Sequence, residues 1–168
     1  VLNPPQADAE TFIIADASTL DLRARQGSAG RPELVQLEGF HVERELARGG
    51  TSVVYLARSL KLKRLVALKV LLVGTSSSPS ARERFRIEAL ATARLRHPNI
   101  VGVHEVREER GIPYLVMDYI DGESLAARLE AGEPLEPREA ARLCQRLALA
   151  LVHAHAQAIL HRDLKPAN

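Results

Sequence analysis

The sequence has almost no cysteine, no long apolar run and little excess of charge, and each absence limits what the protein can be. Cys144 stands alone among 168 residues, so no internal disulfide can form, which favours a reducing compartment such as the cytoplasm. The densest apolar run, residues 147–152, is far shorter than the ~18 residues of a membrane span. No signal-peptide pattern is present. We therefore expect a cytoplasmic domain with no membrane segment in this chain; an anchor elsewhere in a longer protein is the alternative.

Charge and composition divide the chain into two parts. The formal net charge is only +2 and the basic residues form no stripe, so nucleic acid is not an expected partner. Residues 1–38 contain turn-forming prolines and glycines with only scattered apolar positions, which predicts a linker or disordered arm. Residues 39–168 alternate apolar and polar positions in regular patterns, which predicts one folded domain.

The last eight residues, 161–168, combine an acid, a cation and an amide in a loop stiffened by a proline. Asp163 can orient an attacking hydroxyl and accept its proton, and Lys165 can neutralise charge on a phosphoryl group in transfer. Asn168 can hold a metal ion that bridges the phosphates. The same residue types are common in ordinary turns, which is the alternative for this loop alone.

A glycine turn between two expected strands lies near the start of the domain. The turn and its flanks read Leu46, Ala47, Arg48, Gly49, Gly50, Thr51, Ser52, Val53 and Val54. A strand, a glycine turn and a second strand let backbone N–H groups lie over a phosphate chain. A plain β-hairpin is the alternative if this motif is taken alone.

A lone lysine, Lys69, follows within an apolar strand expected over residues 64–73. Burying an ammonium group without a partner is costly, so we expect a carboxylate nearby. A helix expected from Ser80 has Phe85, Glu88, Ala91 and Leu95 on one face at helical spacing, which makes Glu88 the expected counter-ion. The alternatives are a lysine on the exposed face of an edge strand and a glutamate in a surface salt bridge.

In this order, the motifs resemble the catalytic domain of the bacterial serine/threonine protein kinases of eukaryotic type. The resemblance rests on Ala67-Leu68-Lys69, Pro98-Asn99-Ile100-Val101 and the loop of residues 161–168. It covers residues 39–168 and implies an α+β, protein-kinase-like fold. The N-lobe would span 39–117 and would consist of a five-stranded antiparallel sheet plus one helix. The hinge would span 118–122, and the first helices of the C-lobe would span 123–168.

The resemblance also implies a function and a set of site residues. The reaction would transfer the γ-phosphoryl group of ATP, with Mg²⁺, to serine or threonine hydroxyls of protein substrates. The implied catalytic residues are Asp163, Lys165, Asn168, Lys69 and Glu88, with Asn168 also the metal ligand. The implied nucleotide contacts are Leu46, Ala47, Arg48, Gly49, Gly50, Thr51, Ser52, Val54, Ala67, Lys69, Met117, Asp118 and Ile120. Within this set Met117 is the gatekeeper, and the backbones of Asp118 and Ile120 read the adenine edge.

Two departures from the family pattern keep other functions open. The family loop reads Leu-Gly-x-Gly-x-x-Gly-x-Val, whereas Ala47 and Ser52 replace two of its glycines here. A Cβ at these positions hinders close approach and positive φ, so we expect an impaired phosphate cover. This supports the alternative of a pseudokinase, a nucleotide-binding or scaffolding module without catalysis. A small-molecule phosphotransferase shares the spacing of Asp163 and Asn168, but Arg162 and Lys165 favour a protein substrate.

The chain begins with Val1 and ends inside the last motif. In the family an Asp-Phe-Gly motif and an activation segment would follow. We therefore expect the 168-residue piece alone to be inactive and poorly stable.

Overall fold

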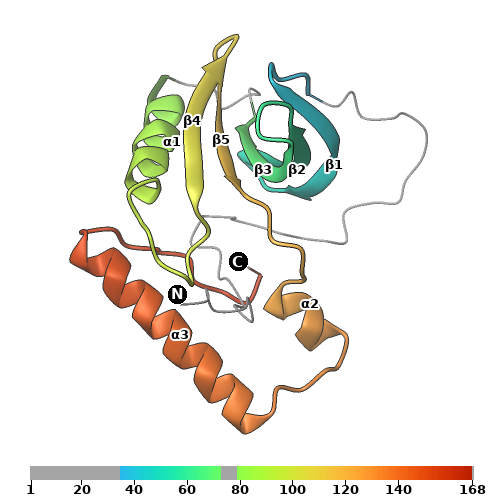
Figure 1. The fold of residues 1–168 in the computed structure, drawn as a ribbon. Helices are drawn as coiled ribbons and strands as arrows, with labels where there is room; N and C mark the ends of the chain where they lie inside the picture. The colour runs from blue at the N-terminus through green and yellow to red at the C-terminus, as the bar shows by residue number, and fades with distance from the viewer. Residues whose placement is uncertain (1–34, 73–78, 168) are drawn as a thin grey trace, which may run out of the picture.

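A five-stranded antiparallel sheet dominates the computed structural model, which describes residues 35–72 and 79–167. Its strands are β1 (Phe40–Arg48), β2 (Ser52–Ser59), β3 (Arg64–Leu71), β4 (Val103–Glu109) and β5 (Ile112–Asp118). Their order in the sheet is β1-β2-β3-β5-β4 (Figure 1). The predicted sheet is confirmed.

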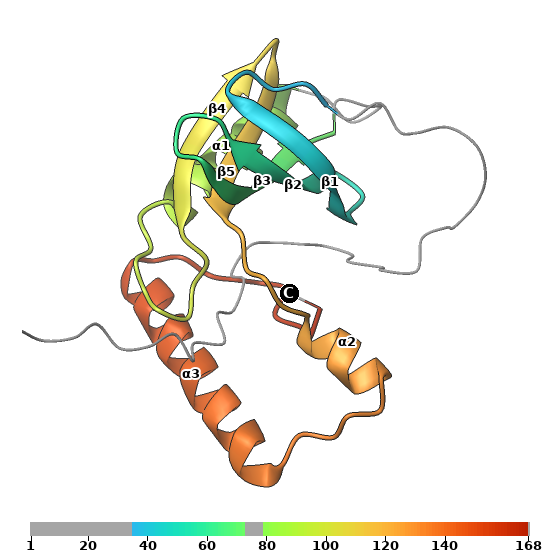
Figure 2. The ribbon, with the colours of Figure 1, turned by 45° about the vertical axis from the view of Figure 1, so that its right-hand side comes forward.

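The three helices of the described residues lie in two separate parts of the molecule. Helix α1 (Pro79–Thr92) lies beside β4, while α2 (Leu125–Glu130) and α3 (Pro137–Ala156) lie beyond the end of β5 (Figures 1 and 2). Helix α1 begins one residue before the predicted start at Ser80. Local sequence explains the other boundaries. Ser124 caps α2 by accepting a hydrogen bond from the Ala127 N–H, Gly132 follows α2 with φ of 76°, and Pro137 opens α3.

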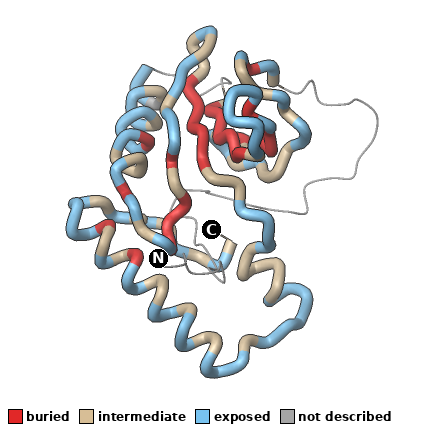
Figure 3. Tube along the Cα trace, in the orientation of Figure 1, coloured by how far each residue is buried: buried red, intermediate tan, exposed pale blue. Residues whose placement is uncertain are grey.

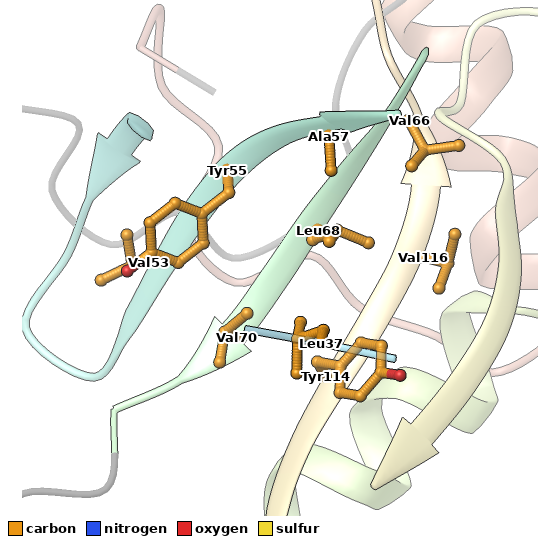
Figure 4. Close-up of a cluster of buried hydrophobic side chains, with 9 residues drawn as sticks. All are labelled: Leu37, Val53, Tyr55, Ala57, Val66, Leu68, Val70, Tyr114 and Val116. Carbon is orange, nitrogen blue, oxygen red and sulfur yellow. The ribbon is translucent and has the colours of Figure 1, made fainter. Parts of the chain in front are cut away.

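Strand β3 supplies side chains to two separate apolar clusters because successive residues of a strand point to opposite faces. Val66, Leu68 and Val70 belong to one cluster, which is shown in Figure 4. Ala67 belongs to the other, which also contains residues of α1. Strand β3 is therefore buried on both faces, and this explains why residues 65–71 form a nearly continuous apolar run.

The folded part begins before the predicted boundary at residue 39. Leu37 is buried in the cluster of Figure 4, and Val35 packs against the same cluster. The prediction of a linker or arm over 1–38 is therefore wrong for its last residues, whose apolar positions were too few to signal burial. Residues 1–34 lie outside the described ranges.

Helix α3 is joined to the rest of the molecule through a small apolar contact. Ala150 and Ala154 pack against Leu95 and Ile100, which lie in the segment after α1. They are the only buried residues of this helix, and much of its surface is exposed (Figure 3). Across the described residues, none of the helices combines the length and the apolar composition that crossing a bilayer requires.

Candidate active site

Lys69 lies in the middle of the sheet, on β3 between β2 and β5. Its backbone pairs in register with Val54 on one side and Leu115 on the other. Only 9% of the residue is exposed. Because Ala67 is two residues away, Lys69 shares the face of the sheet on which Ala67 joins the cluster with α1. The alternative of a lysine on the exposed face of an edge strand is therefore wrong.

The residues predicted to surround an adenine ring gather in one apolar cluster. Ala67 and Met117 are buried in it, and Leu46 and Val54 pack against it while keeping part of their surface exposed. The four side chains come from β3, β5, β1 and β2, respectively. Since Val54 also pairs with Lys69, the apolar cluster and the lysine adjoin each other. Half-exposed aliphatic side chains beside a buried cation suit a ligand with a flat apolar part and an anionic part.

Strand β5 ends at Asp118, whose backbone N–H donates to the Gly102 carbonyl at 2.9 Å. Its carboxylate Oδ1 lies 2.7 Å from His104 Nε2. Ile120, two residues further on, is 38% exposed. Within the described residues the backbone of Ile120 forms no hydrogen bond, so its N–H and C=O can be used by a ligand.

The glycine turn is a tight hairpin. The Gly49 N–H donates to the Ser52 carbonyl at 2.8 Å, and the Arg48 Nε donates to Glu45 Oε1 at 2.9 Å. This hydrogen bond to Glu45 raises the pKa of Arg48 above its ordinary value. Neither Ala47 nor Ser52 has positive φ. Both residues belong to extended strands, so their Cβ atoms cause no backbone strain there.

The loop of residues 161–167 is held against helix α2. The Pro166 carbonyl accepts a hydrogen bond from the Ala126 N–H at 2.9 Å, and Figure 2 shows the loop reaching the start of α2. Arg162 has φ of 62°, an uncommon conformation for a residue with a side chain. The loop thus turns sharply just before Asp163.

Asp163 and Lys165 form an ion pair with 2.7 Å between Nζ and Oδ2. Their side chains are 40% and 33% exposed, so both can still be reached by another molecule. An acid and a cation in contact offer an acceptor for a hydroxyl proton and a positive charge for a phosphoryl group. The predicted metal ligand, Asn168, lies outside the described residues.

Glu88 is exposed in the described structure. The face of α1 that meets the sheet contains Phe85 and Ala89, and Ala93, just after the helix, continues the same row; Ala89 is 1% exposed. The predicted face through Glu88 is therefore wrong. The helix uses an i, i+4, i+8 row that includes two small residues, which let it approach the sheet closely.

The sequence did not predict the roles of Gly102 and His104, which contact Asp118 at the end of β5. Their signal was a glycine next to a strand, since a glycine there often marks close approach of another group. The sequence also did not predict the contact of Pro166 with Ala126, for which no sequence signal exists.

The order of these elements, the central lysine and the terminal loop together define a protein kinase. The family model described as "Protein kinase domain" matches residues 40–168, so the chain belongs to the protein kinase family. The chain is 39% identical over 129 residues to the serine/threonine-protein kinase PrkC of Bacillus subtilis. This alignment covers 77% of the chain and 20% of PrkC. It is also 40% identical over 142 residues to the serine/threonine-protein kinase PknB of Mycobacterium tuberculosis. This second alignment covers 82% of the chain and 21% of PknB.

A solved structure is also similar. The M. tuberculosis PknI kinase domain aligns with a TM-score of 0.69 at 34% identity, and the alignment covers 80% of this chain and 54% of that one. These comparisons confirm the predicted fold class and family. The chain spans about a fifth of the length of the curated relatives and about half of the kinase domain of known structure.

Proposed function

We propose that the protein carrying this chain is an ATP-dependent protein kinase that phosphorylates serine or threonine hydroxyls. The observation that carries the proposal is the apolar cluster of Leu46, Val54, Ala67 and Met117 directly beside the buried Lys69. This pairing matches the two ends of ATP, a flat aromatic base and a polyanion. Lobe boundaries at 39–117, 118–122 and 123–168 belong to the same proposal.

At the adenine end, Leu46, Val54 and Ala67 would cover the ring and Met117 would limit the depth of its site. The backbone groups of Asp118 and Ile120 would bind its polar edge. Support comes from the free N–H and C=O of Ile120, since a ligand can bind them without breaking an existing hydrogen bond.

At the phosphate end, the backbone of residues 47–52 would lie over the phosphates and Lys69 would bind them. A lysine in a buried strand binds an anion strongly because water screens its charge poorly there. We propose that Glu88 pairs with Lys69 once nucleotide is bound. Since Glu88 is exposed, this requires α1 to turn or shift.

Magnesium fits this site as an ion that arrives with the nucleotide. Among the described residues no three His, Cys, Asp or Glu side chains form a group that holds a metal alone. Mg²⁺ commonly needs only one or two protein oxygen ligands when phosphates supply the others. Asn168 would supply such a ligand, and the ion would neutralise charge on the phosphates.

For the transfer itself, Asp163 would orient the substrate hydroxyl and accept its proton. Lys165 would neutralise the developing charge on the phosphoryl group. Their contact at 2.7 Å and their partial exposure support these roles. Arg162 and Lys165 in the same loop favour a protein over a small molecule as the substrate.

The proposal is tested by nucleotide affinity. We expect Lys69→Met to weaken binding of Mg²⁺–ATP to the 168-residue chain by about tenfold or more, because an ion contact with the phosphates is lost. Lys61→Met, in the exposed turn between β2 and β3, is the matched control and should leave the affinity unchanged. Calorimetric titration measures both, and circular dichroism checks that each variant folds. Equal affinities for the two variants would contradict the proposed nucleotide site.

A further inference from the structure

His104 occupies an irregular place in strand β4. Val103 pairs with Met117 and Glu105 pairs with Val116, so His104 is an extra residue that has no partner of its own in the register with β5. A bulge of this kind redirects a side chain relative to a regular strand. Here the imidazole is directed at Asp118, the last residue of β5.

Three strands meet at this imidazole. His104 Nε2 lies 2.7 Å from Asp118 Oδ1 of β5 and 2.9 Å from the Arg64 Nη2 of β3. One ring nitrogen cannot donate to a carboxylate and accept from a guanidinium at the same time. The carboxylate contact requires the proton on Nε2, so in that state His104 donates to Asp118 and Arg64 contributes its positive charge nearby.

Gly102 holds Asp118 from the other side. Its carbonyl accepts the Asp118 N–H at 2.9 Å, and a Cβ on Gly102 would lie only 2.6 Å from Asp118 Oδ2. Any larger residue at position 102 would therefore displace the Asp118 carboxylate. Both the backbone and the carboxylate of Asp118 are fixed by residues 102–104.

We infer that His104 is a positioning residue for nucleotide binding, acting through Asp118. Asp118 is the first residue of the proposed hinge, so fixing it sets the path of residues 118–120 that would bind the adenine edge. The inference rests on the proposed function. Because the His104 and Asp118 side chains are 27% and 43% exposed, the contact adds little to global stability, and its effect is local.

The test compares His104→Leu, which removes the donor, with His104→Gln, whose amide N–H can replace it. His41→Leu, at an exposed position of β1, is the matched control. Two quantities are measured on the 168-residue chain: hydrogen exchange of the Asp118 amide without nucleotide, and affinity for Mg²⁺–ATP and for Mg²⁺–tripolyphosphate, which lacks the base.

We expect His104→Leu to speed exchange of the Asp118 amide and to weaken ATP binding about two- to fivefold, with tripolyphosphate binding unchanged. His104→Gln and His41→Leu should behave like the wild type. Gly102→Ala, which displaces the Asp118 carboxylate from the opposite side, should reproduce the effect of His104→Leu.

The inference is overturned if exchange at Asp118 is unchanged in His104→Leu, or if ATP and tripolyphosphate lose affinity equally. Failure of the proposed function has a different signature, because the wild-type chain itself would then bind no ATP. Faster exchange in His104→Leu with no change in ATP affinity would reduce His104 to a purely structural role and would also overturn the inference.

Discussion

His97 illustrates how the surroundings of one residue shift its pKa. Its ring packs against that of His153 on α3, with 5.4 Å between centroids, and its Nδ1 accepts a hydrogen bond from the Asn99 N–H at 3.1 Å. Burial, and then the neighbouring His153, lower the pKa of His97 below its ordinary value.

This lowered pKa predicts a loss of stability in mild acid. The unfolded chain takes up the proton at about pH 6.5, whereas folded His97 does so only at lower pH, so the unfolded state binds more protons in between. The contribution of His97 is therefore fully present above about pH 6.5 and is lost as the pH falls through its folded pKa. Thermal unfolding between pH 7.5 and 5.5 measures it.

His97→Asn should show a shallower fall in melting temperature over this range, because asparagine does not titrate and keeps an acceptor for the Asn99 N–H. His155→Gln, at an exposed position of α3, serves as the control and should fall as steeply as the wild type. Parallel curves for the wild type and His97→Asn would show that His97 does not contribute to the acid sensitivity.

At the scale of elements, the sheet was predictable and the packing of α1 was not. The alternation of apolar and polar residues and the glycine turns predicted the strands, because both signals depend only on the residues of the strands and of the turns themselves. The face of α1 depends on which row of side chains fits the sheet, and a row with Ala89 and Ala93 packs more closely than one through Glu88. The same distinction between local sequence signals and packing between elements applies to the site. Lys69 and the apolar cluster were predictable, whereas the contacts of Asp118 depend on a bulge that the sequence does not reveal.

Helix α2 supports the terminal loop, since its Ala126 N–H binds Pro166. Ser124→Ala removes the N-cap bond to Ala127 and should cost about 1 kcal/mol of stability. Glu136→Gln is the control, since the N-cap of α3 makes no side-chain capping bond. Denaturant unfolding compares the two, with amide exchange at Ala126 reporting the loop contact. Exchange at Ala126 that is as slow in Ser124→Ala as in the wild type would show that the cap does not hold the loop.

In the whole molecule, the sheet and the two helices beyond it meet through few residues. The buried contact of Leu95 and Ile100 with Ala150 and Ala154 is one connection, and residues 119–124 are a second. The terminal loop runs between these parts and is hydrogen-bonded to the start of α2 (Figures 1 and 2). In the proposed function, a nucleotide bound on the sheet side presents its phosphates to this loop.

Lysine labelling tests this requirement most directly, because the chain has only four lysines, Lys61, Lys63, Lys69 and Lys165. An ATP analogue with an acyl group on its terminal phosphate transfers that group to an amine in contact with the phosphates, and mass spectrometry identifies the labelled residue. The proposed function predicts labelling of Lys69, with or without Lys165, that excess ATP prevents. Labelling confined to Lys61 and Lys63, or labelling that ATP does not reduce, would contradict it.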